Sequence, residues 1–125
     1  MTVERRKYIR FLTQDNSFAK LKGIFNKVGK VNDIGICGLS FSYLRESDKT
    51  GSGSVYPRVD IYYKKEFYLT NVHCTVVYDI PENTSVRNHS SIMYRCGLYF
   101  GKLSKIQLKL LNIFIHKYTT EILSS

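Results

Sequence analysis

Apolar and polar residues alternate along several short segments of the chain, which is the pattern of strands that bury one face. The alternation is clearest in "GLSFSYL", and it is also present in "FAKLKGIF", where basic residues separate the apolar ones. The region from Phe18 to Leu44 therefore predicts two or three short strands. The residues expected to face the core in this half are Phe18, Leu21, Phe25, Leu39, Phe41 and Tyr43.

The second half continues this pattern. "RVDIYYKKEFYLTNVHCTVVYDI" predicts two strands joined by a hairpin turn at 64–66, and "IMYRCGLYF" predicts another strand. Loops are expected over 45–57 and over "PENTSVRNHSS", both rich in turn-forming residues. The predicted inward faces are Val72, Cys74, Val76 and Tyr78 in one strand, and Ile92, Tyr94, Cys96, Leu98 and Phe100 in the other. Short strands between turns are typical of an all-β barrel or sandwich.

Near the end of the chain the spacing of apolar residues changes from every second residue, as in a strand, to about every 3.6 residues, as in a helix. In "SKIQ", Ser104 can cap a helix while Gln107 reaches back, which is a capping box. We therefore predict one helix from Lys105 to Tyr118, packed on the sheet or barrel mouth. Its expected apolar face follows helical spacing and consists of Ile106, Leu110, Ile113 and Phe114, with the stem of Lys117.

Composition is consistent with one domain. The 125 residues are 43% hydrophobic, which is enough for a core, and leave little room for a second domain. The charged N-terminus is followed by no apolar signal sequence, and "LLNIFI" is too short to span a bilayer. We therefore expect a cytoplasmic protein without membrane insertion.

The charge balance of the chain indicates the kind of partner that the protein binds. Nineteen Lys and Arg stand against ten Asp and Glu, a formal net charge of +9. Such a surplus favours an anionic partner, which includes nucleic acid, a phosphorylated small molecule, an acidic protein or a membrane surface. Charge by itself does not choose among these classes.

Neither a metal site nor a catalytic constellation is predicted. Cys37, Cys74 and Cys96 are widely spaced and lack a CxxC pair, so we interpret them as small apolar residues rather than ligands. His73 and Cys74 would point to opposite faces of a strand and cannot easily share one metal ion. The three histidines have no recognisable catalytic partner, and "GSGS" lacks the lysine and helix of a phosphate-binding loop. We expect a binding module, not an enzyme.

The N-terminal stretch "ERRKYIRF" combines cations with apolar residues. Arg6 and Arg10 are four residues apart, so their side chains lie on one face of either a helix or a strand. Two guanidinium groups at this spacing can converge on a phosphate or on the O6/N7 edge of guanine. By itself the stretch also fits a solvated basic arm.

A second stretch, "DIGICG", covers residues 33–38. The Asp33 carboxylate can accept hydrogen bonds from the N1 and N2 donors of guanine, and Gly38 allows a tight turn into the next strand. By itself this stretch equally fits a strand that ends in a glycine bend.

Taken together, the two stretches resemble the PilZ domain family, bacterial receptor modules for cyclic di-GMP. That family carries RxxxR before the barrel and (D/N)xSxxG on an early strand. The chain fits the first motif at Arg6 and Arg10 and the second at Asp33 and Gly38. It departs at Gly35, where the family usually has Ser. "YRCGLYFGKLSKIQLKLLNIFI" also resembles the closing strand and helix, so the resemblance covers nearly the whole chain.

The resemblance implies a six-stranded antiparallel, Greek-key-like β-barrel with a C-terminal helix. It divides the chain into an arm at 1–17, a barrel at 18–101 and a helix at 104–118. The ligand would be cyclic di-GMP, with no further cofactor and no metal. The ligand-binding residues it implies are Arg6 and Arg10 as the clamp, Asp33, Gly35 and Gly38 on the barrel, and Arg5 for a second ligand molecule.

The resemblance also implies second-messenger signalling, with outputs such as motility or biofilm formation passed to an unidentified downstream protein. A missing hydroxyl at position 35 is expected to weaken binding by about 1 kcal/mol. Two alternatives stay open. One is an adaptor of the same fold that has lost the nucleotide. The other is a small basic barrel that binds single-stranded nucleic acid, although polynucleotide binding is the less favoured.

Overall fold

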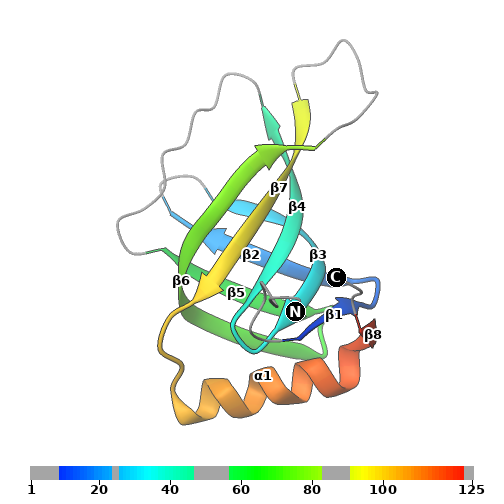
Figure 1. Ribbon diagram of the computed structural model, residues 1–125, viewed down its shortest axis with the longest axis vertical. Helices are drawn as coiled ribbons and strands as arrows, with labels where there is room; N and C mark the ends of the chain where they lie inside the picture. The colour runs from blue at the N-terminus through cyan, green and yellow to red at the C-terminus, as the bar shows by residue number, and fades with distance from the viewer. Residues whose placement is uncertain (1–8, 24–25, 47–56, 83–90, 123–125) are drawn as a thin grey trace, which may run out of the picture.

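The computed structural model describes residues 9–23, 26–46, 57–82 and 91–122 (Figure 1). Within these residues it contains eight strands and one helix. They are β1 (Arg10–Thr13), β2 (Ser17–Lys22), β3 (Lys27–Gly35), β4 (Gly38–Glu46), β5 (Arg58–Tyr63), β6 (Phe67–Pro81), β7 (Ser91–Phe100), α1 (Lys105–Tyr118) and β8 (Thr119–Ile122).

Six of the strands close into a barrel. Their order is β2-β5-β6-β7-β4-β3, and pairing between β2 and β3 completes the ring. All the strand pairs described are antiparallel. β1 adds to the outside edge of β3, and β8 adds to β1. The predicted six-stranded antiparallel barrel with a C-terminal helix is therefore confirmed.

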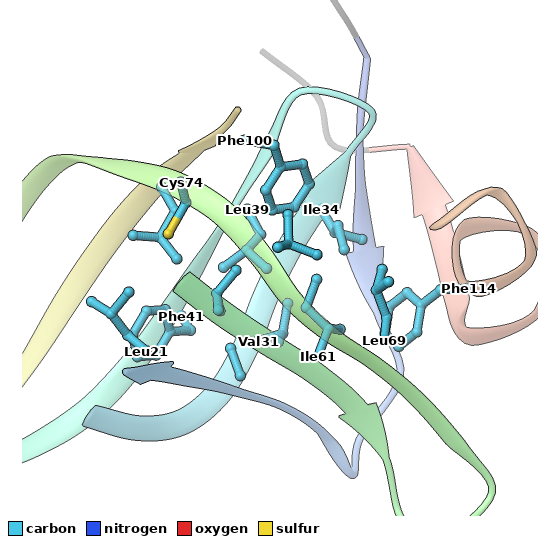
Figure 2. Close-up of a cluster of buried hydrophobic side chains, with 14 of the residues drawn as sticks. Leu21, Val31, Ile34, Leu39, Phe41, Ile61, Leu69, Cys74, Phe100 and Phe114 are labelled. Carbon is cyan, nitrogen blue, oxygen red and sulfur yellow. The ribbon is translucent and has the colours of Figure 1, made fainter. Parts of the chain in front are cut away.

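The core fills the inside of this barrel (Figure 2). Leu39 and Phe41 of β4 are fully buried, as are Cys96 and Leu98 of the paired strand β7. The alternation predicted for these strands is thus confirmed. Ile92, the second residue of β7, departs from it and is 41% exposed.

Helix α1 begins and ends where the sequence predicted. The Ser104 hydroxyl accepts from the Gln107 amide at 3.0 Å, and the Gln107 side chain accepts from the Ser104 amide at 3.0 Å. The predicted buried face was partly wrong: Ile106 is 72% exposed and Ile113 is 37% exposed. The helix lies across one end of the barrel in Figure 1 and buries three positions, of which Phe114 was predicted, and aromatic packing fixes its rotation. These are Leu111, Phe114 and Tyr118.

Two further predictions of inward-facing residues were wrong. Tyr78 was expected to share a face with Val76, but the register shifts between these residues, and the β-bulge turns Tyr78 outward. Phe18 also points away from the core, since Ala19 and Leu21 are the buried residues of β2. Its ring stacks on Tyr62 with centroids 5.7 Å apart.

The loop predictions are only partly covered. The turn at 64–66 is confirmed by the Glu66 amide donating to the Tyr63 carbonyl at 3.0 Å, and by the positive φ of 50° at Lys64. The other two predicted loops, and Phe25, lie mostly or wholly outside the described residues, although β4 and β6 run further into the first and second loop than expected. No described helix is long and apolar enough to cross a membrane.

Candidate functional site: a two-arginine cluster on the barrel wall

Asp33, the first residue of "DIGICG", lies on the outer wall of the barrel, where β3, β4, β7 and β6 are neighbours in the sheet. Asp33 pairs with Ser40, Ser40 with Gly97, and Gly97 with Tyr78. Directly paired residues share one face of a sheet. Since the next residue in β3, Ile34, is in the core, Asp33 and its row face outward.

Asp33 is the centre of this wall, and it is almost fully buried, with 4% of its surface exposed. Its Oδ1 accepts from Arg10 Nη1 at 2.7 Å. Its Oδ2 accepts from the Ser40 hydroxyl at 2.7 Å and from Arg95 Nη2 at 3.2 Å. A carboxylate with three donors is well compensated for its burial. It holds two guanidinium groups in place and is not itself presented to a ligand in this arrangement.

Arg10 reaches Asp33 because it is part of the sheet. It lies in β1, where it pairs with Gly35, and Leu12 of the same strand pairs with Asp33. The sequence placed Arg10 in an arm over 1–17, whereas the structure incorporates residues 10–13 into the sheet. The Arg10 side chain is 19% exposed, so it is not fully covered by the ion pair.

The two glycines of the second motif allow close backbone approach. A Cβ on Gly35 would lie less than 3.0 Å from the Ile9 carbonyl oxygen and 3.1 Å from Arg10 Cδ. A Cβ on Gly38 would lie less than 3.0 Å from the Leu98 carbonyl oxygen and 3.2 Å from Arg10 Nη2. The departure from the family serine at position 35 therefore coincides with the packing of β1 on β3. A serine would not fit this backbone without movement.

Sequence reasoning missed Arg95. It lies in β7, and its Nη2 contacts both Asp33 and the Ser40 hydroxyl, the latter at 3.1 Å. Its side chain is 41% exposed. The strand alternation around "YRCGLYF" did place Arg95 on the outer face, opposite Cys96, but only the barrel brings that face to Asp33, 62 residues earlier.

Two tyrosines border the cluster. A Cβ on Gly97 would collide with the Tyr78 ring, so Tyr78 packs directly over this glycine. Tyr99, on the same face of β7, pairs with Gly38 and is 54% exposed. Exposed aromatic rings beside cations are suited to stacking with planar bases.

The cluster carries an excess of positive charge. Two guanidinium groups, from Arg10 and Arg95, share the single carboxylate of Asp33. Guanidinium groups can bind phosphate and the guanine edge in a bidentate way. Arg5 and Arg6, the other predicted ligand residues, lie outside the described residues.

The cysteines were interpreted as small apolar residues, which fits the two that are buried. Burial raises the pKa of Cys74 to about 11 and that of Cys96 to about 12. Cys37 is half-buried, and all three are free thiols. Among the described residues, no group of three or more potential metal ligands comes together.

This arrangement of barrel and C-terminal helix is the PilZ fold. The chain is similar to the PilZ domain of YcgR from Escherichia coli solved with c-di-GMP, with a TM-score of 0.68 and 11% identity over 90% of this chain and 91% of that one. It is also similar to the K. pneumonia MrkH–c-di-GMP complex, with a TM-score of 0.67 and 11% identity over 92% of this chain and 52% of that one.

A crystal structure of whole YcgR from Escherichia coli with c-di-GMP gives a TM-score of 0.61 and 13% identity, with 91% of this chain covering 46% of that one. The chain thus spans about half the length of whole YcgR and of MrkH. No protein-family model and no curated protein sequence matches the chain. The resemblance in fold inferred from the sequence is confirmed by structure alone.

Proposed function

We propose that this chain is a receptor for cyclic di-GMP, acting as a binding module and not as an enzyme. The observation that carries the proposal is the Arg10–Asp33–Arg95 cluster, in which one buried carboxylate pairs with two arginines whose side chains are partly exposed. The three similar structures were each solved with c-di-GMP. At 11–13% identity they give the fold, and the cluster supplies the argument for the ligand.

Each residue has a distinct role in the proposed complex. Arg10 and Arg95 contact the phosphates or a guanine edge, since both have unneutralised donors. Asp33 keeps these side chains in place, and Gly38 leaves room for the Arg10 guanidinium beside the Leu98 carbonyl. Arg6, with Arg5 before it, completes the clamp from the other end of the RxxxR motif. The nucleotide would tie this part of the chain to the barrel wall, and a cytoplasmic partner protein would recognise the resulting surface.

Isothermal titration calorimetry with cyclic di-GMP tests the proposal. The unmodified protein is expected to bind, and Arg10→Ala is expected to lose most of the affinity. Arg58→Ala is the matched control, because Arg58 is an exposed arginine on β5, across the barrel from β4. Absence of binding at high micromolar nucleotide would favour the adaptor that works by protein–protein interaction alone. Equal losses in Arg10→Ala and Arg58→Ala would mean that the site is misplaced.

Single-stranded nucleic acid is the other ligand to be distinguished, since the net charge is +9 and Tyr78 and Tyr99 are exposed. A polynucleotide that releases many counterions would bind with a steep dependence on salt. A ligand with two phosphates should show a shallow dependence. Titrations of cyclic di-GMP and of an oligonucleotide at several salt concentrations separate the two classes.

A further inference from the structure

A second surface of the molecule has a different character from the two-arginine cluster. A groove of about 1170 Å³ runs between α1 on one side and β8 with Phe11 of β1 on the other. We call it the α1–β8 groove. It is larger than the ~300–1,000 Å³ typical of small-molecule pockets. Its helical wall, 14 residues long, extends for about 21 Å.

Apolar side chains that the barrel leaves uncovered lie along this groove. Leu108 is 41% exposed, Ile113 is 37% exposed, and Ile122 of β8 is 60% exposed. The first two belong to α1 and lie outside the positions that it buries against the barrel, Leu111, Phe114 and Tyr118. An apolar strip flanked by polar residues is characteristic of a surface that binds another macromolecule.

Charges around the strip are mostly of one sign. Lys105, Lys109 and Lys117 line the groove together with His116, and among the described residues the only acidic one that lines it is Glu121. With three lysines against one glutamate, this described lining has a formal charge of +2 when His116 is neutral. Electrostatic complementarity therefore requires an acidic occupant.

We propose that the α1–β8 groove binds an acidic amphipathic helix of a partner protein. The apolar face of such a helix would cover Leu108, Ile113 and Ile122, and its carboxylates would meet the flanking lysines. Charge argues against the chain's own N-terminal stretch as the occupant of the groove, because that stretch contains Arg5, Arg6 and Lys7. It also argues against a second copy of the chain, which would carry a net charge of +9. Leu108, Ile113 and Ile122 are aliphatic and offer no aromatic ring for base stacking, so a nucleic acid would leave the strip uncovered.

The groove and the two-arginine cluster share strand β1. Phe11 lines the groove and pairs with Ile34 and Ile122, and its neighbour Arg10 is bound to Asp33. A ligand that binds Arg10 would therefore contact β1, the strand whose Phe11 forms part of the groove. This coupling rests on the proposed nucleotide binding, whereas docking of the helix does not.

The test uses a fluorescent, acidic amphipathic peptide of about four helical turns, with Leu at i, i+3, i+4 and i+7 and Glu outside. Fluorescence anisotropy should show micromolar binding that weakens with salt. Ile113→Glu should weaken it at least about tenfold, since it places a charge like those of the peptide in the strip. Ile106→Glu is the matched control, because Ile106 lies on the same helix and is 72% exposed but does not line the groove. Thermal melts of both variants verify the fold.

Four results would overturn the docking proposal. They are an absence of peptide binding, equal binding of a peptide with the same residues in scrambled order, a normal affinity in Ile113→Glu, or a higher affinity after removal of residues 1–8. If the protein binds anionic phosphatidylglycerol vesicles and Ile113→Glu loses that binding, the groove is instead a membrane-binding surface. If the protein dimerises in ultracentrifugation and Ile113→Glu abolishes the dimer, the groove instead binds a second copy. Titrating the peptide with and without cyclic di-GMP tests the coupling separately, so failure of nucleotide binding leaves the docking result intact.

Discussion

Restoring the family serine at position 35 should harm this protein rather than improve it. From the motif, Gly35→Ser would be expected to add one hydrogen bond to the nucleotide, worth about 1 kcal/mol and roughly a fivefold gain in affinity. The structure predicts otherwise, because the space for a Cβ is occupied by the Ile9 carbonyl oxygen and the Arg10 side chain.

The size of the effect follows from this collision. The Ile9 backbone would have to withdraw by about 1 Å to restore ordinary contact, and insertions into packed sites typically cost about 1–3 kcal/mol. Because β1 pairs with β3 at Arg10 and Gly35, the movement would also disturb the Arg10–Asp33 ion pair. We therefore expect a lower Tm, by roughly 3–10 °C for a domain of this size, and no gain in affinity.

The variant Gly35→Ala adds a Cβ without a hydroxyl, so it separates the effect of the Cβ from that of the serine hydroxyl. If the Cβ is what matters, the Ala and Ser variants should lose similar stability in thermal melts, and calorimetry should find neither binding cyclic di-GMP more tightly than the unmodified protein. Gly101→Ser is a control, since a Cβ there would meet nothing closer than His73 Cβ at 3.3 Å. A Gly35→Ser variant with an unchanged melt and severalfold tighter binding would refute the close packing of β1 on β3.

Three other predictions follow from the site and the core. Arg95→Ala should weaken cyclic di-GMP binding at least about tenfold in calorimetry, as expected when a charge-assisted contact is lost, and unchanged affinity would remove Arg95 from the site. Asp33→Asn should lower the free energy of unfolding by about 1–3 kcal/mol in urea, because it leaves two arginines without their carboxylate, and an unaltered urea midpoint would contradict the ion-pair geometry. The free energy of unfolding should also fall as pH rises from about 9 towards 11. The thiols of Cys74 and Cys96 have raised pKa values in the folded protein, whereas in the unfolded chain the thiol pKa is near 9.0. The unfolded chain therefore releases protons that the folded chain retains, which favours unfolding at high pH. Melts from pH 7 to 11 measure this, and Cys96→Val should reduce the slope.

Several features of this protein were determined by the sequence itself. The bounds of α1 could be predicted because its capping box and helical period are local, within a few residues of Ser104. The alternation in β4 and β7 likewise predicted which residues face the core, apart from Ile92, since a strand with one buried face has a period of two. The two short motifs were sufficient to suggest the PilZ fold.

Other features were decided only by contacts between distant segments. The bulge before Tyr78 depends on its pairing with β7, and the rotation of α1 depends on the aromatic residues it meets, so neither appears in the local pattern. The same holds for the site: Arg10, Asp33 and Arg95 come from three strands, and the pairing of β1, β3, β4 and β7 brings both guanidinium groups within 3.2 Å of the Asp33 carboxylate. Gly35 is the clearest case. In the motif it is only a position that lacks the serine hydroxyl, whereas in the folded chain a glycine is required there by the close packing of Ile9 and Arg10. Local periodicity determines which way a side chain points, but tertiary pairing determines what it meets.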